Sequence, residues 1–549
     1  MPSLRLENFA LLAVCCCVLS AFPLLFDRTL TTHETVHCQN VREMRADGDL
    51  IIPHYGGRPW LERPPLPFWL TIPLVEAVGD QPVTYRLASA LVGLGCVLLV
   101  GWVASVWYGR SVGLLSGIAM ATLRLFFHYA LGPEAEIFLC ASVLSATALF
   151  VHLEFRLRPT PNSEPWLIGR RPWALLAFFA VLGLTNLVKG LFFGDAFVIL
   201  PAAVFLLWGK KPLSLVRRYV WLPGWLVFVV FGGAWAVAAY LRHPDVVDLW
   251  LSDYRGRLDQ GFMREPAYYY LMNLPWAIFP WTLLAFVGLA WTWRQALTQG
   301  RTPERFLWCW ALVPLVFLSL PNGKHQHYLL PALAPWAILG AVGAVRLWRY
   351  LTESWRLAAT PRNAWIAASA LFVMAAAFSW AVEASPRLRH DRYTADRAFV
   401  REVKGAVPQG QTLLVLDDWG PLDASWLLFH LDGRAQLLHN VTFLLDERLG
   451  RDREVFVVAR RHRARALAAF GRCERLFESA CSRGEPPGEP PTDMRLGLYR
   501  LRLEVPRHRG AVYVSPMQAT GRAPGPWLTP PELERNHSPE PPTLSIGGR

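Results

Sequence analysis

The sequence predicts a mainly α-helical protein that crosses a membrane many times and carries a small α/β domain towards its C-terminus. Of its 549 residues, 53% are hydrophobic and only 18% are charged. The apolar residues gather in separate runs of about 17 to 25 residues, the length that a helix needs to cross roughly 30 Å of hydrocarbon. This composition excludes a chain built only of ordinary soluble domains.

About eleven apolar runs have the length and composition of membrane spans. The first, residues 1–26, has a short basic head but no small-residue cleavage site after it, so we expect an uncleaved span and not a signal peptide. The other expected spans are residues 84–108, 112–129, 136–153, 173–188, 190–208, 221–240, 271–293, 306–320, 328–345 and 364–382.

Basic residues between the spans predict their orientation. Arg and Lys gather in the loops that include residues 156–171, 210–218 and 346–356, which we therefore expect on the cytoplasmic side. The connections between them, above all residues 27–83 and 321–327, then face outward, as does the C-terminus. Because this clustering accounts for the net charge of +13, we expect no nucleic-acid partner.

The composition changes after the expected membrane domain of residues 1–383. Residues 384–505 alternate between strand-like and helix-like stretches, which predicts a small outward α/β domain. Residues 506–549 are rich in Pro, Gly and charge, and this predicts a disordered tail. The strand-like runs are residues 412–416, 435–438 and 454–459.

The first outward loop, residues 27–83, gathers titratable side chains near the membrane surface. His33 and Glu34 open a stretch with helical spacing, which ends at a Gly-Asp pair. Arg63 precedes two prolines and several aromatic residues, which predicts a rigid element at the membrane surface. Glu34 or His33 is suited to remove a proton, and Arg63 is suited to bind phosphate oxygens. A structural ion-pair network explains the same residues equally well.

Three further charged residues fall at the outward ends of expected spans. Glu134 and Glu136 lie at the start of the fourth span, where a carboxylate is costly unless it faces water or a partner. Lys189 directly follows the fifth span, where snorkelling to the interface explains it better than contact with a phosphate does.

The short outward loop at residues 321–327 combines a cation, histidines and a following phenol. Lys324 and Tyr328 stand four residues apart, so they can share one helical face and meet a phosphate together. His325 and His327 invite a metal site, but no third ligand stands at a recognisable spacing. We therefore expect no cofactor, and a divalent metal is the alternative.

Four motifs in this order resemble the membrane glycosyltransferases of the C-type fold (GT-C), in particular the branch of bacterial aminoarabinose transferases (ArnT-like) and protein O-mannosyltransferases. The resemblance covers roughly the first two-thirds of the chain. The motifs are His33-Glu34 followed by Arg42-Glu43-Met44 and Gly48-Asp49, Arg63-Pro64-Pro65-Leu66 to Trp69, Lys189-Gly190, and Lys324 to Tyr328-Leu329-Leu330-Pro331.

The resemblance implies an enzyme that moves a sugar from a polyprenyl-phosphate carrier to a lipid A, glycan or protein acceptor by inverting displacement. It also implies a bacterial inner-membrane protein whose catalytic loops and C-terminal domain are periplasmic. Arg63, Lys324 and Tyr328 are the implied carrier-phosphate ligands, and Lys189 is a further candidate.

The resemblance implies that the acidic pair of the first loop is the catalytic site. This chain has His33-Glu34 where the family usually has Asp-Glu. Proton removal therefore falls to His33 or Glu34, or to one of the second-loop acids, Glu134 and Glu136. One alternative is a non-catalytic relative that binds lipid-linked saccharide. The other is a transporter, for which the sequence lacks paired broken spans in two matching halves.

Overall fold

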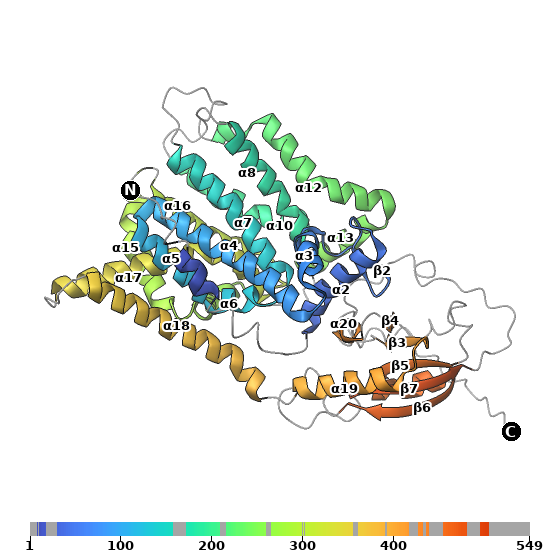
Figure 1. The fold of residues 1–549 in the computed structure, drawn as a ribbon. Coiled ribbons are helices and arrows are strands. Elements are labelled where there is room, and N and C mark those ends of the chain that lie inside the picture. The colour runs from blue at the N-terminus through green and yellow to red at the C-terminus, as the bar shows by residue number, and fades with distance from the viewer. Residues whose placement is uncertain are drawn as a thin grey trace, which may run out of the picture.

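The chain forms a bundle of helices at whose end a small sheet domain is attached (Figure 1). This computed structural model describes residues 8, 10–17, 30–157, 172–208, 216–259, 265–298, 300, 302–354, 361–389, 392–416, 426–431, 435–438, 454–479 and 495–503. Most of the expected first span and the whole expected tail therefore lie outside the described residues.

The bundle has the composition of a polytopic membrane domain, as the sequence predicts. Within the described residues, four helices are long and apolar enough to cross a membrane, or seven if each bent pair is one span. The four are α4 (Pro82–Tyr108), α7 with its π-helical end (Ala135–Arg156), α8 with α9 (Pro172–Lys189) and α12 (Leu222–Arg242). Also in the bundle are α10 (Phe193–Leu207), α16 (Pro303–Ser319) and α18 (Pro361–Arg389).

Three of the expected spans are bent instead of straight. The expected spans 112–129, 271–293 and 328–345 each contain a break, because apolar composition continues through a bend and hydropathy does not reveal it. Pro280 falls at one break and lacks the amide hydrogen that helix continuation needs. The pairs are α5 (Arg110–Thr122) with α6 (Arg124–Ala130) at 68°, α14 (Tyr269–Ala277) with α15 (Thr282–Thr298) at 113°, and η3 (Gln326–Ala332) with α17 (Ala334–Ser354) at 64°.

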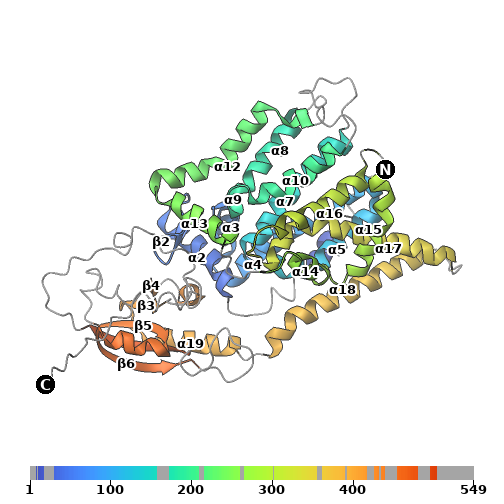
Figure 2. The ribbon, with the colours of Figure 1, turned by 180° about the vertical axis from the view of Figure 1, so that it is seen from behind.

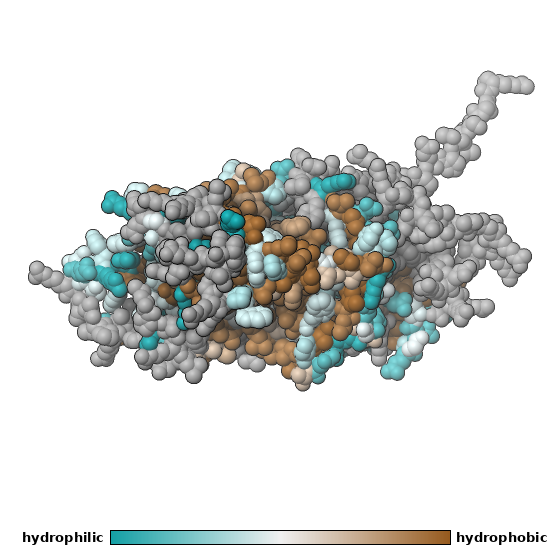
Figure 3. Space-filling model, turned by 90° about the horizontal axis from the view of Figure 1, so that it is seen from above, coloured by the Kyte–Doolittle hydropathy of each residue, from teal (hydrophilic) through white to brown (hydrophobic). Residues whose placement is uncertain are grey.

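The bundle exposes apolar side chains, as a lipid-facing surface requires. On α12, for example, Leu226, Val229 and Val230 are each more than half exposed. Figure 3 shows one face of the molecule, where apolar residues cover the middle and hydrophilic residues gather towards the two ends.

The C-terminal domain is a five-stranded mixed sheet with α19 (Arg392–Ala406) beside it (Figure 2). The strand order is β4-β3-β5-β7-β6, and β3 pairs in parallel with β4 and β5. The three strand-like runs of the sequence are confirmed as β3 (Leu413–Leu416), β4 (Ala435–Leu438) and β5 (Glu454–Arg460). The sequence missed β6 (Gly471–Glu478) and β7 (Leu496–Leu503), in which charged and apolar residues are mixed.

The first loop contains two helices. The helical spacing predicts the first, and the rigid element expected after the proline pair is the second. In α2 (Thr32–Asp47), Thr31 and Glu34 form a capping box, and Gly48 ends the helix in the left-handed conformation with φ 72°. Helix α3 (Leu66–Val78) follows the prolines directly. Between them, β1 (His54–Tyr55) and β2 (Arg58–Pro59) form a short hairpin.

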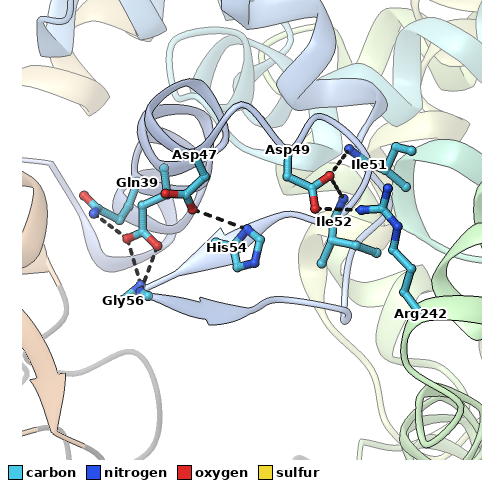
Figure 4. A network of polar contacts seen from close by, with 10 residues as sticks. Gln39, Asp47, Asp49, Ile51, Ile52, His54, Gly56 and Arg242 are labelled. Atoms are coloured by element: carbon cyan, nitrogen blue, oxygen red, sulfur yellow. Dashed lines mark hydrogen bonds and ion pairs between the residues drawn. The ribbon is translucent and has the colours of Figure 1, made fainter. Parts of the chain in front are cut away.

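Polar contacts tie the end of α2 to the hairpin and to α12 (Figure 4). Asp49 accepts hydrogen bonds from the amides of Ile51 and Ile52 at 2.9 and 3.2 Å, and Arg242 of α12 lies 2.7 Å from its other oxygen. On the opposite side, the Glu43 carboxylate accepts a hydrogen bond from the Gly56 amide at 2.8 Å. The first loop is thus a folded unit and not a flexible linker.

The sheet domain packs on this loop through α20 (Trp426–His430), which lies next to α2 in Figure 1. Arg42 of α2 donates to the Phe429 carbonyl at 2.7 Å and stacks on the Phe429 ring at 3.8 Å. The same guanidinium binds both oxygens of Asp80 at 2.7 and 3.2 Å. Tyr55 of the hairpin lies in the hydrophobic core of the sheet domain. The domain and the loop therefore share one packed interface.

We expect Gly56→Ala to loosen this interface. A Cβ at Gly56 would lie 2.7 Å from the Leu437 Cβ, and its φ of 64° is left-handed. Gly57→Ala is the matched control, because its φ is 76° but nothing lies within 4 Å of its Cβ position. Chemical unfolding in detergent should show Gly56→Ala to be less stable than Gly57→Ala by about 1–3 kcal/mol. Equal destabilisation by the two variants would contradict the packing.

Candidate active site

Residues from five separate elements meet at the end of the bundle that faces the sheet domain. They come from the start of α2, the segment before α3, the start of α7, the end of α9, and η3. The electrostatic neighbours of His33 are Arg63, Glu136 and Lys189, although these residues are far apart in the sequence. The structure thus brings together most of the site residues that the sequence suggested: His33, Glu34, Arg63, Glu134, Glu136, Lys189 and Tyr328.

A buried ion pair lies at the centre of this cluster. The Lys189 ammonium donates to the Glu136 carboxylate at 2.5 Å, and both side chains are largely shielded from solvent. The ammonium also lies 4.6 Å from the centroid of the Tyr328 ring, and His327 Nε2 lies 3.6 Å from the same carboxylate oxygen. The expectation that Lys189 snorkels to the interface is wrong, because its ammonium is buried and pairs with Glu136.

Arg63 is half-buried near the pair and differs from the other cations of the cluster. It acts electrostatically on His33, Glu136 and His327. Among the described residues, no carboxylate lies within ion-pair distance of its guanidinium. Arg63 is therefore a cation that can accept an anionic ligand, whereas Lys189 already has a partner.

The backbone before Arg63 is held by tryptophans that the sequence did not single out. Trp250 of α13 (Val246–Asp259) donates its indole N–H to the Leu61 carbonyl at 2.9 Å, two residues before Arg63. Trp235 of α12 donates to the Ile51 carbonyl at 2.8 Å, and the two indoles pack at 5.6 Å. These contacts fix the position of the backbone from which the Arg63 side chain extends.

The Glu34 carboxylate is engaged in structural contacts. One of its oxygens accepts the Thr31 amide at 2.8 Å in the capping box, and the other lies 3.2 Å from the Nε atom of Arg86. Glu34 and Arg86 are both buried. Of the two interpretations of the first loop, the structural ion pair therefore fits Glu34, and its partner is Arg86. A charged residue within an expected span was the signal that could have revealed Arg86.

Glu134 is the carboxylate of the cluster that is left without such contacts. It is half-buried at the N-cap of α7, and among the described residues its side chain has no hydrogen-bond donor and no ion-pair partner. Burial raises its pKa, and the negative charges of Glu136 and Glu34 add to this effect. A carboxyl group with a raised pKa can exchange protons near neutral pH.

His33 lies on the solvent side of the cluster. Loss of hydration in this crowded region lowers its pKa, and the charges of Arg63 and Lys189 lower it further, while Glu136 opposes the shift. The ring is therefore neutral at pH 7, and it can exchange hydrogen bonds with a ligand without contributing a charge.

Lys324 does not share a helical face with Tyr328, and in this respect our expectation is wrong. Lys324 precedes η3, and its buried ammonium donates to the carbonyls of Pro321 and Glu265 at 2.5 and 3.0 Å. It therefore ties two loops together, while Tyr328 meets Lys189 instead. Within the part of the chain that the structure describes, no three His, Cys, Asp or Glu side chains form a group that could hold a metal ion.

The helical bundle with its folded first loop and its sheet domain has the GT-C fold of membrane glycosyltransferases, which the sequence motifs predicted. Solved structures of known proteins have a similar fold. The ArnT of Cupriavidus metallidurans bound to undecaprenyl phosphate has a TM-score of 0.70 at 18% identity, covering 89% of this chain and 97% of that one. The oligosaccharyltransferase of Archaeoglobus fulgidus has a TM-score of 0.52 at 12% identity, covering 84% and 69%.

Sequence relatives point to the same group. Residues 13–249 match the family described as dolichyl-phosphate-mannose-protein mannosyltransferase. The chain is 27% identical over 337 residues to the undecaprenyl phosphate-alpha-4-amino-4-deoxy-L-arabinose arabinosyl transferase of Aeromonas hydrophila, covering 61% of this chain and 58% of the relative. It is 30% identical over 336 residues to a transferase of the same name from Pseudomonas fluorescens, covering 59% and 58%.

The chain thus matches less than two-thirds of the length of these relatives. The resemblance to ArnT-like GT-C glycosyltransferases that the sequence motifs predicted is confirmed.

We expect Lys189→Met to destabilise the protein strongly, because it leaves the Glu136 carboxylate buried without its partner. Removing one member of a buried ion pair typically costs about 3–5 kcal/mol. The double variant Lys189→Met/Glu136→Gln removes both charges and should recover much of this loss. Unfolding in detergent measures all three variants. Losses that simply add in the double variant would show that the two side chains do not interact.

Proposed function

We propose that this protein transfers a sugar from a polyprenyl-phosphate carrier to a lipid, glycan or protein acceptor. One juxtaposition carries the proposal: Arg63, a cation without an anionic partner among the described residues, lies in the same cluster as the Glu134 carboxylate. Sugar transfer from a phosphate carrier needs these two groups, a cation for the leaving phosphate and a base for the acceptor. The similarity to transferases named for undecaprenyl phosphate and dolichyl-phosphate mannose supports the choice of carrier.

The proposed reaction is a single inverting displacement. The acceptor hydroxyl gives its proton to the Glu134 carboxylate, and its oxygen forms a bond to the anomeric carbon of the sugar. The bond from that carbon to the phosphate oxygen breaks, and the electron pair leaves with the polyprenyl phosphate. Arg63 and Lys189 stabilise the charge that develops on the phosphate, with Tyr328 beside them. His33 contributes hydrogen bonds to the reacting groups.

The proposal places the protein in a bacterial inner membrane with the cluster and the sheet domain on the periplasmic side. The basic loops at residues 156–171, 210–218 and 346–356 support this orientation, because Lys and Arg favour the cytoplasmic side. The acceptor is then a molecule of the outer cell envelope.

A second candidate function is binding of a lipid-linked saccharide without transfer. It is favoured by the contacts of Glu34, whose carboxylate is occupied by Arg86 and the Thr31 amide, so this acid of the first-loop motif is not available as a base. Carrier binding without product, for every acceptor tried, would support this function over transfer.

We expect Glu134→Gln to reduce turnover by about 100-fold or more, the usual range for loss of a general base. Because a base must be ionised, wild-type turnover should rise with pH as Glu134 loses its proton. Burial and the charge of Glu136 place this rise above the usual range for a glutamate. Liposomes with labelled undecaprenyl-phosphate sugars, assayed between pH 5 and 9, measure both effects.

The control for this prediction is Glu34→Gln. It should lower the unfolding temperature by weakening the α2 cap and the Arg86 contact. It should keep an acid limb in the pH profile, shifted towards lower pH, because the negative charge of Glu34 helps to raise the pKa of Glu134. Full turnover by Glu134→Gln, or loss of the acid limb in Glu34→Gln, would reject Glu134 as the base.

We expect Arg63→Ala to weaken the binding of the carrier by about 10- to 100-fold, the equivalent of one hydrogen bond to a charged group. Arg63→Lys should recover part of the loss, because it keeps the charge but not the paired N–H groups. The matched control is Arg294→Ala, an exposed arginine of α15 beside Trp293. Binding of undecaprenyl phosphate to the protein in nanodiscs measures this effect. Equal binding by all variants would remove Arg63 from the site.

A further inference from the structure

A buried carboxylate lies beside the site but is not part of the proposed chemistry. Asp195 stands in the first turn of α10, and only 2% of it is exposed. A carboxylate inside an apolar bundle is costly, so it persists where it meets a specific requirement. Among the described residues, no cation pairs with Asp195, so charge neutralisation does not explain it.

The partners of Asp195 are neutral hydrogen-bond donors at the junction of α8 and α9. Thr185 donates its hydroxyl to one carboxylate oxygen at 2.7 Å, and Asn186 donates its side-chain amide to the other at 2.9 Å. Thr185 and Asn186 are both buried. Asp195 therefore links the start of α9 to the first turn of α10.

Asn186 also contacts the last residue of the α9–α10 turn, Phe192, which precedes α10. Its side-chain oxygen accepts the backbone amide of Phe192 at 2.6 Å. Phe192 has φ 65°, the only positive φ of a non-glycine residue in the described chain. Such a conformation is strained for a bulky side chain and persists only when its surroundings impose it. The side chains of Asp195 and Asn186 supply that restraint.

Lys189, the cation at the centre of the cluster, lies between the residues that make these contacts. It is the last residue of α9. Gly190 follows it with φ 104°, so the chain reverses immediately after the lysine. Close packing supports the reversal, because a Cβ at Gly194 would lie 2.7 Å from the Thr185 Cβ. No side chain can therefore be added there without moving Thr185 and the start of the turn.

We propose that Asp195 and Asn186 are positioning residues that hold the α9–α10 turn so that Lys189 reaches Glu136 and the phosphate of the carrier. This inference rests on the proposed function, in which Lys189 contacts that phosphate. It assigns Asp195 a geometric role: its two hydrogen bonds, to Thr185 and Asn186, are needed, and its negative charge is not.

The test compares Asp195→Leu with Asp195→Asn. Leucine removes both acceptors. In Asp195→Asn, the new side-chain oxygen accepts the hydrogen bond from Asn186. The Thr185 hydroxyl can donate its hydrogen to the Leu182 carbonyl, 2.8 Å away, and its oxygen then accepts a hydrogen bond from the new amide. We expect Asp195→Leu to weaken undecaprenyl phosphate binding in nanodiscs about tenfold, the equivalent of one lost hydrogen bond to a charged group. Asp195→Asn should bind within about twofold of the wild type, since an asparagine keeps the two contacts.

A double variant distinguishes positioning of Lys189 from a general structural role. If Asp195 acts through Lys189, then Lys189→Ala/Asp195→Leu binds undecaprenyl phosphate no more weakly than Lys189→Ala alone. Wild-type binding by Asp195→Leu, additive losses in the double variant, or equal damage by Asp195→Asn would each overturn the proposal. If Asp195→Leu does not fold, Thr185→Val removes one donor with little change of shape and must show the same non-additivity with Lys189→Ala.

The binding measurement separates this inference from the proposed function. If the wild type transfers no sugar from any labelled carrier, the proposed transfer fails. The dependence of undecaprenyl phosphate binding on Lys189 and Asp195 is still measured in that case. If transfer is observed but binding does not depend on Asp195, only the positioning role fails.

Discussion

The ion pair between Lys189 and Glu136 is the interaction on which the candidate site depends. Each of these two buried charges stabilises the other, because either charge alone would lose its hydration without gaining an ionic partner. Lys189 ends α9 and Glu136 begins α7, while Tyr328 and His327 of η3 pack against them. One contact therefore fixes three elements, and Arg63 and Glu134 are placed around it.

The three carboxylates of the cluster have different surroundings, and this gives them different chemistry. Glu34 is held by Arg86 and by the cap of α2, and Glu136 is held by Lys189. Glu134 has neither kind of contact among the described residues, and burial raises its pKa. Carboxyl groups of the same intrinsic acidity can thus serve as a structural link, a counter-ion and a proton acceptor.

Local signals in the sequence predicted much of the fold. The helical spacing that opens at His33-Glu34 and the stop at Gly48-Asp49 predicted α2, because helix periodicity and termination are local properties of the chain. The bends within the expected spans were not predictable, because apolar composition is the same on both sides of a break. The same holds for β6 and β7, in which arginines and glutamates pair across the strands, as Arg500 does with Glu474, and hide the usual alternation.

The candidate site was predictable as a set of residues but not as a set of contacts. Motif order pointed to His33, Arg63 and Lys189, and the structure places them together. Which partner each side chain takes depends on packing between distant elements. Arg86 as the partner of Glu34, and the carbonyls that hold Lys324, are both of this kind.

The stacking of Arg42 on Phe429 links the position of α2 to that of the sheet domain. Arg42 lies about two turns along α2 from Glu34, and its guanidinium is held between Asp80 and the sheet domain. A helix held at that point cannot rotate without breaking the contact. Separation of the sheet domain from the first loop therefore requires loss of the contacts that hold the helix bearing His33.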